Sequence, residues 1–362
     1  MRLDWIDRWK GLLIILVVAG HVCGGACHLC GGSSRTAFSL LYKIIYMFHM
    51  PAFFWISGVC WKNKEGRFID FARKKAERLL LPYFVFGILS VFLYLLTTPD
   101  GELFSVAQDN YYVNMGAKSV LQPFLSLLLG NGWPNGEGFR CNSVLWFLPA
   151  MFSVLCFYRI VDYFIKRRNL QLALAFFLLI LELLGNKYGN PLLPFGLSSI
   201  TWYCPFLIFG RWFGVHNESM CLPRGTRTYV FLATICIFYC FLSWLEPNYS
   251  MRWVSSFWFI VFTMMAVIGV ILSACVAKSI PWKLLARLGQ ASLGIMLLHK
   301  FFVIFFQIKL PVLSYMLQQS IVLFWLGNIV VLVVSVLLCY VITCFVIRYA
   351  PWTLGAFSKT KL

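Results

Sequence analysis

The chain has 362 residues, of which 60% are hydrophobic, 18% aromatic and only 12% charged. Soluble globular domains carry roughly 25% charged residues, so this composition excludes an ordinary soluble domain. Apolar runs recur from end to end and predict a single membrane domain over residues 1–362, with no attached soluble domain. The net charge of +18 does not indicate nucleic-acid binding, because no nucleic-acid-binding motif or basic helix accompanies it.

The apolar runs predict an all-α bundle of about ten transmembrane helices. The first covers roughly residues 9–28 and leads into a short Gly/Ser turn at residues 24–34. The second covers residues 38–61, and we expect Pro51 to kink it. A basic loop at residues 62–78 leads to the third helix at 79–96. The remaining spans are predicted at residues 143–164, 170–184, 197–213, 229–245, 253–276, 291–308 and 320–349.

The stretch at residues 100–142 is acidic and holds an apolar piece at residues 120–129. That piece is too short to span a bilayer, so we interpret it as re-entrant or interfacial. If the N-terminus is cytoplasmic, every inner segment is basic, and the largest outer segment is the acidic one. The positive-inside bias therefore predicts that both termini are cytoplasmic.

The first helix carries the most informative polar residues. Lys10 and His21 are eleven positions apart, which places them on one helix face about 16 Å apart along the axis. Asp7 lies close to the same line and can pair with Lys10. Histidine can remove a proton from an alcohol near neutral pH, and lysine can bind phosphate. The face therefore suits an anionic ligand that enters from the cytoplasm; alternatively, Lys10 snorkels and His21 bonds a neighbouring helix.

The same helix ends in a dense group of soft and imidazole side chains: His21, Cys23, Cys27, His28 and Cys30. Such ligands can bind zinc or copper, but their spacing is compressed onto one helix end and lacks a second paired set. We therefore predict no metal site. A local disulfide between Cys27 and Cys30 is an alternative to free thiols, which are the expected outcome.

Five segments, taken in order, resemble the acyltransferase-3 family of membrane acyltransferases. They are the start Asp7-x-x-Lys10-Gly11 with Gly20-His21, Phe48-His49-Met50-Pro51 with Ser57-Gly58, Arg73-Lys74-Lys75-x-x-Arg78 with Pro82-Tyr83, Leu145-Trp146-Phe147-Leu148-Pro149, and Gly289-x-x-Ser292 with His299. The resemblance covers essentially the whole chain. Where the family's common pattern has arginine before the histidine, this chain has Lys10, which loses a bidentate fork but keeps the charge.

The resemblance implies a membrane O-acyltransferase, of the O-acetyl type, that uses cytoplasmic acetyl-CoA or another acyl-CoA. The acceptor would be a hydroxyl group of a cell-envelope sugar, polysaccharide or glycan precursor, and the location a bacterial inner membrane. No tightly bound cofactor is expected. On this interpretation His21 and Asp7 are catalytic and Lys10, Arg78 and Arg73 bind the acyl donor. The side chains expected to line the acceptor site are His49, Trp146 and His299.

Two alternatives remain open from the sequence. His49 and His299 can be interhelical hydrogen-bonding residues, and Trp146 can belong to the interfacial aromatic belt. The whole protein can also be a transporter or exporter of a glycan or small metabolite. Transporters of that kind have paired helix breaks in two related halves and charges at the membrane midplane. Pro51 has no matching break in the second half, which favours the enzyme.

Overall fold

The computed structural model describes residues 4–62, 66–96, 118–130, 139, 141–188, 193–214, 241, 256–309 and 312–356. Within these ranges the regular structure is helical and contains no strand, which confirms the predicted all-α class. The predicted helix at residues 229–245 and most of the acidic stretch before residue 118 lie outside the described ranges. The chain divides into two compact units, which are described separately.

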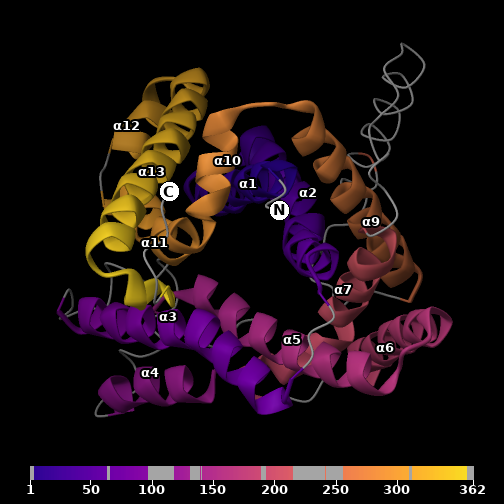
Figure 1. The fold of residues 1–362 in the computed structure, drawn as a ribbon. Helices are drawn as coiled ribbons and strands as arrows, with labels where there is room; N and C mark the ends of the chain where they lie inside the picture. Colours follow the sequence, from indigo (N-terminus) through magenta and orange to yellow (C-terminus); the bar gives the residue numbers. More distant parts are fainter. Residues whose placement is uncertain are drawn as a thin grey trace. The chain divides into compact units, whose positions relative to one another are not determined.

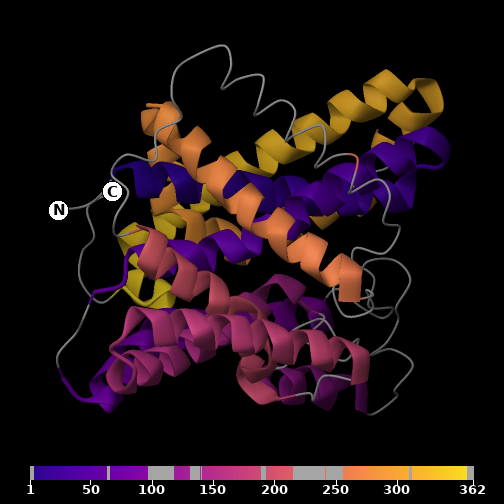
Figure 2. The same cartoon turned by 90° about the vertical axis from the view of Figure 1, so that its right-hand side faces the viewer.

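Unit 1 comprises Met1–Lys62, Arg167–Asn190 and Thr201–Ser292. Helix α1 packs against α2, α9 and α10; Figure 1 shows α10 beside α1, and Figure 2 shows α9 crossing α1 and α2 obliquely. The indole of Trp9 is buried at this interface and donates a hydrogen bond to Ser273 Oγ at 2.9 Å. The described helices of this unit are α1 (Asp4–Leu29), α2 (Gly32–Val59), α6 (Arg168–Tyr188), α7 (Ile200–Gly214), α9 (Ser256–Ser279) and α10 (Lys283–Gln290).

Two glycines allow α1 and α10 to approach until their backbones touch. A Cβ atom at Gly11 would overlap the carbonyl oxygen of Leu285, and one at Gly289 would overlap the carbonyl oxygen of Asp7. Small residues permit such close approach between helices in membranes. The contact fixes the first turns of α1, which carry Asp7 and Lys10, against a helix almost 280 residues later in the chain.

Unit 2 comprises Asn63–Lys166, Pro191–Ile200 and Leu293–Leu362. Helix α3 packs against α4 and α5, and the Tyr83 hydroxyl donates to the Leu127 carbonyl at 2.8 Å. The described helices are α3 (Phe68–Leu96), α4 (Lys118–Leu129), α5 (Phe147–Phe164), α11 (Ser292–Ile304), α12 (Val312–Gln319) and α13 (Ile321–Tyr349). Short helical turns join them: η2 (Ser143–Trp146), η3 (Pro194–Ser199), η5 (Phe305–Lys309) and η6 (Pro351–Leu354).

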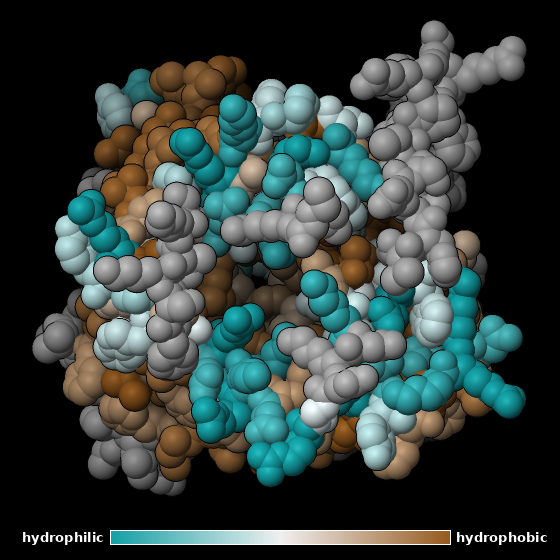
Figure 3. All heavy atoms as spheres, viewed as in Figure 1, coloured by the Kyte–Doolittle hydropathy of each residue, from teal (hydrophilic) through white to brown (hydrophobic). Residues whose placement is uncertain are grey.

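Seven described helices are long and apolar enough to cross a membrane, or eight if α10 and α11 together form one broken span. Helix α13 exposes large apolar side chains along its length, such as Val322, Val330 and Phe345, and the same region is brown in Figure 3. Exposed apolar side chains on so many helices match a lipid environment, because a soluble protein rarely leaves patches of that size uncovered. The chain is a multi-pass membrane protein. The count of ten spans, the cytoplasmic termini and the single-domain organisation stay predictions.

Two loops predicted from composition are helical. Residues 68–78, assigned to the basic loop, form the first three turns of α3. Ion pairs at helical spacing stabilise this segment: Arg73 Nε lies 3.2 Å from Glu77 Oε1, and Arg67 before it contacts Asp70. The Gly/Ser turn predicted at residues 24–34 is also mostly helical, since α1 continues to Leu29 and α2 begins at Gly32. The ring of Tyr42 on α2 packs closely against Gly24.

The short apolar piece at residues 120–129 is the twelve-residue helix α4, which is too short to span a bilayer, as predicted. Helix α2 continues through Pro51. The segment at residues 283–290, predicted to belong to a cytoplasmic loop, is helix α10. The apolar face of α10 packs on α1 and buries Leu285 and Leu288. This packing explains why a charged segment is helical.

Candidate active site

At the N-terminal end of the predicted α1 face lies a buried carboxylate, that of Asp7, with two polar neighbours. Asp7 is only 4% exposed, and Lys10 Nζ lies 3.8 Å from its Oδ1. Gln290, the last residue of α10, donates from Nε2 to Asp7 Oδ2 at 3.4 Å. The Lys10 side chain itself is 34% exposed. Asp7 therefore orients an accessible cation, and α10 holds Asp7 in place.

His21 lies fourteen residues after Asp7 on α1, where it faces α2. Fourteen residues correspond to about 21 Å along the helix axis, so Asp7 acts on Lys10 and does not touch the imidazole. The hydroxyl of Tyr46 on α2 lies 3.3 Å from both Nδ1 and Nε2 of His21. The two rings meet edge to face, with centroids 5.9 Å apart. Tyr46 is thus positioned to hold the imidazole of His21 by one hydrogen bond.

Tyr46 also connects His21 to His49. The rings of Tyr46 and His49 are 4.8 Å apart, and the ring of Tyr42 stacks on Tyr46 at 3.9 Å. His49 is buried, and its Nδ1 lies 2.7 Å from the Ile45 carbonyl oxygen. Because a carbonyl can only accept, Nδ1 carries a proton, and in the neutral ring Nε2 keeps its lone pair. The structure therefore brings two of the predicted site histidines to one tyrosine.

The predicted donor-binding arginines lie on the first turns of α3 in unit 2. Arg73 is exposed and paired with Glu77, whereas Arg78 is exposed and forms no ion pair with any described acidic residue. An exposed cation without a partner is available for a phosphate group. Of the two, Arg78 is therefore the better candidate.

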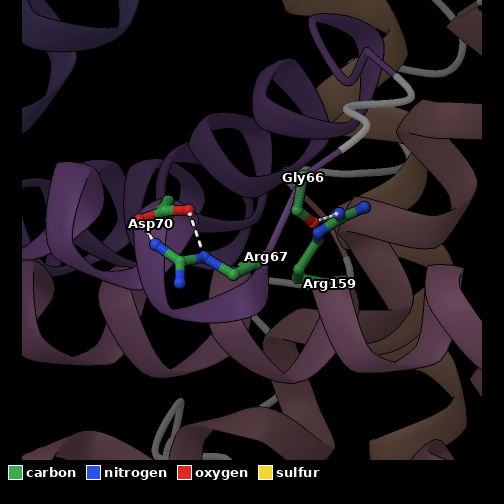
Figure 4. Close-up of polar contacts among 4 residues, drawn as sticks. All are labelled: Gly66, Arg67, Asp70 and Arg159. Carbon is green, nitrogen blue, oxygen red and sulfur yellow. Dashed lines mark hydrogen bonds and ion pairs between the residues drawn. The ribbon is translucent and has the colours of Figure 1, made fainter.

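A buried arginine fixes the turn that precedes these residues. Figure 4 shows Arg159 of α5 reaching to Gly66, whose carbonyl oxygen accepts from Nη2 at 3.0 Å. The guanidinium also lies over the ring of Phe71, 5.9 Å from its centroid. Gly66 has a φ of 117°, a conformation that side chains rarely permit. Arg159 thus anchors the start of α3, which carries the candidate donor-binding residues.

Trp146 and His299 lie in other parts of unit 2. Trp146 is the last residue of η2 and is partly exposed. His299 is fully buried in α11 and uses Nδ1–H to bond the carbonyl of Ile295 on its own helix at 3.0 Å. This bond fixes the tautomer of His299 in the same way as in His49. Their contact with an acceptor stays a prediction.

The cysteine-rich end of α1 holds free thiols at Cys27 and Cys30, and no disulfide joins them. Among the described residues, no group of three or more His, Cys, Asp or Glu side chains is arranged to hold a metal ion. In unit 2, burial raises the pKa of the Cys141 thiol to about 12, although the Lys300 charge nearby opposes the shift. A thiol with that pKa is almost entirely protonated at neutral pH and is a poor nucleophile.

Sequence reasoning missed three residues of this arrangement: Tyr46, Arg159 and Gln290. Tyr46 had a detectable signal, because it lies three positions before His49 on one helix face, but its contact with His21 depends on the register between two helices. Arg159 also has a signal in the sequence, because a charged residue inside an apolar helix is a functional candidate. Gln290 lies in a segment predicted to be a loop, and only the packing of α10 on α1 brings it to Asp7.

These features define a polytopic helical membrane protein with an imidazole at a helix interface and a buried acid–lysine pair on the same helix. The family model described as an acyltransferase domain, that of the acyltransferase-3 family, matches residues 3–344. The chain therefore belongs to the acyltransferase-3 family of membrane acyltransferases, which confirms the resemblance found in its motifs.

Among curated proteins, the chain is similar to nodulation protein NolL of Mesorhizobium japonicum, with 26% identity over 252 residues. The alignment covers 67% of this chain and 57% of NolL, so the chain spans little more than half the length of that relative. No solved structure matches the chain.

Proposed function

We propose that this acyltransferase moves an acetyl group from cytoplasmic acetyl-CoA to a hydroxyl group of a cell-envelope sugar, polysaccharide or glycan precursor, in a bacterial inner membrane. The observation that carries the proposal is the contact between His21 and Tyr46. This contact supports the proposal because an imidazole beside a hydroxyl, within an apolar helix of a family acyltransferase, can accept a proton. Ionisable residues inside membrane helices are costly and usually functional.

In the proposed reaction, His21 removes the proton from the acceptor hydroxyl as its oxygen attacks the thioester carbonyl. A new carbon–oxygen bond forms and the carbon–sulfur bond breaks. Coenzyme A leaves as a thiolate, which takes the proton back from the imidazolium of His21. Tyr46 holds the ring throughout. A two-step variant, in which His21 first carries the acyl group itself, uses the same residues.

The donor phosphates would meet the accessible cations. Lys10 is partly exposed and is held by buried Asp7, and Arg78 is exposed at the start of α3. Both lie at helix ends that the positive-inside bias predicts to be cytoplasmic, where coenzyme A is available. Asp7 serves as the positioning residue for Lys10.

The proposal is tested with inside-out membrane vesicles that contain the protein and receive acetyl-CoA labelled in its acetyl group. We expect label in the glycan fraction, and NMR of that glycan would identify the modified hydroxyl. Longer acyl-CoA donors serve as the comparison for donor specificity. Vesicles that transport a glycan but leave every glycan unlabelled would refute the proposal and favour an exporter.

A further inference from the structure

Unit 2 contains a lysine that the proposed reaction does not use. Lys300 lies in α11 among apolar residues, and its side chain is only partly exposed. A charged side chain in such a helix is costly unless a counter-charge or a ligand compensates it. Ion pairs among the described residues join Asp7 to Lys10, Arg67 to Asp70 and Arg73 to Glu77, and none of them includes Lys300.

The surroundings of Lys300 are polar and fixed. Its ammonium group donates to Ser143 Oγ at 2.5 Å. The neighbouring Asn142 is fully buried and donates from Nδ2 to the Leu297 carbonyl, one turn earlier on α11, at 3.1 Å. Asn142 and Ser143 therefore bond to one face of α11, at Leu297 and Lys300. This arrangement fixes the direction of the ammonium group better than a flexible surface lysine could.

Two observations show that the polar cluster is incomplete. The Ser143 hydroxyl supplies one hydrogen bond to Lys300 but no negative charge, which leaves the ammonium group two further N–H donors. Asn142 Oδ1 is buried and accepts no hydrogen bond from any described residue. Buried polar atoms are normally satisfied by protein, water or ligand. Because the Lys300 side chain is partly exposed, a ligand can reach it.

We propose that Lys300 and Ser143 form an oxyanion-binding subsite for the acceptor, which selects an acidic glycan through a carboxylate or phosphate oxygen. An ammonium group beside a hydroxyl offers the donors that such an oxygen accepts. Ser143 begins the helical segment that ends before the basic residues 166–168, so the positive-inside bias predicts that it faces away from the cytoplasm. That side suits an envelope acceptor and not coenzyme A. The inference deepens the proposed function and rests on it for the identity of the ligand as acceptor.

The subsite is tested by binding, which does not require transfer. The thermal unfolding midpoint of the purified protein in detergent is measured against methyl glucuronide, glucose 1-phosphate and coenzyme A. Uncharged methyl glucoside is the matched control, and potassium chloride keeps the ionic strength constant. A ligand that binds only the folded state raises the midpoint as its concentration exceeds Kd. The wild-type protein is compared with Lys300→Met, Lys300→Arg and Ser143→Ala, using the ligand-induced shift of each variant and not its absolute midpoint.

We expect methyl glucuronide or glucose 1-phosphate to raise the wild-type midpoint by a few degrees at saturation, while methyl glucoside leaves it unchanged. The ligand that acts identifies the carboxylate or the phosphate as the preferred group. Lys300→Met should raise the apparent Kd by about tenfold or more, Ser143→Ala should raise it by less, and Lys300→Arg should keep the preference. Coenzyme A should bind Lys300→Met as it binds the wild type.

Three results would overturn the inference: no shift with either acidic ligand, an equal shift with methyl glucoside, or an unchanged shift in both Lys300→Met and Ser143→Ala. Loss of coenzyme A binding in Lys300→Met would assign the lysine to the donor instead. Failure of the proposed acetyl transfer would leave this binding result unaffected, so the two failures can be told apart.

Discussion

The hydroxyl group of Tyr46 provides the sharpest local test of the site. Tyr46→Phe removes only the oxygen that lies 3.3 Å from the His21 imidazole. The phenyl ring keeps its contacts with the rings of Tyr42 at 3.9 Å and His49 at 4.8 Å. The substitution therefore separates the hydrogen bond from the packing of α1 on α2.

The magnitude follows from the bond that is lost. A net hydrogen bond contributes about 0.5–1.5 kcal/mol, and 1.36 kcal/mol is about tenfold in rate, so kcat should fall by roughly 2- to 12-fold. The KM for acyl-CoA should stay unchanged, because donor binding is assigned to Lys10 and Arg78, whereas Tyr46 holds the imidazole of His21.

The assay is the initial rate of acetyl transfer at saturating acceptor, with acetyl-CoA varied, alongside the thermal unfolding midpoint of each purified variant. Tyr42→Phe is the matched control, since it removes a hydroxyl from the neighbouring ring of the same aromatic stack. We expect its kcat to stay within about twofold of the wild type. A wild-type kcat in Tyr46→Phe, or an equal fall in Tyr42→Phe, would refute the role of this hydrogen bond.

Three further predictions concern other parts of the protein. Lys10→Glu should raise the KM for acyl-CoA about tenfold or more while Lys10→Arg changes it little; an unchanged KM in the Glu variant would contradict the phosphate role. Gly289→Ala places a methyl group against the α1 backbone and should cost about 1–3 kcal/mol of stability, whereas Gly31→Ala, with open space around it, should leave the unfolding midpoint near that of the wild type. Cys141, with its pKa raised to about 12 by burial, should resist alkylation at pH 8 while exposed Cys60 reacts, and rapid labelling of Cys141 in the folded protein would argue against its burial.

The sequence predicts the elements that depend on local composition. Long apolar runs locate the spanning helices, and the spacing of Lys10 and His21 places both on one face of the first helix. The pairing of Asp7 with Lys10 also follows from spacing, and the structure has these side chains 3.8 Å apart. These predictions succeed because each rests on residues within one helix.

The missed features depend on contacts between distant segments. Helix α10 carries charges that are typical of a loop, and it packs on α1 because Gly11 and Gly289 remove the side chains that would separate the two backbones. The contact of Tyr46 with His21 requires the register of α1 against α2, which no local pattern specifies. The charged first turns of α3 carry ion pairs at helical spacing, a signal of helix that the basic composition of the segment concealed.

The central claim is that His21 removes the proton from the acceptor hydroxyl. The most direct measurement is the transfer of labelled acetyl groups from acetyl-CoA to glycan in vesicles that contain either the wild-type protein or His21→Ala at matched amounts. We expect that His21→Ala inserts into the membrane and still binds acetyl-CoA through Lys10 and Arg78, but transfers no label above the background of vesicles without the protein. Transfer by His21→Ala at a rate close to that of the wild type would contradict it.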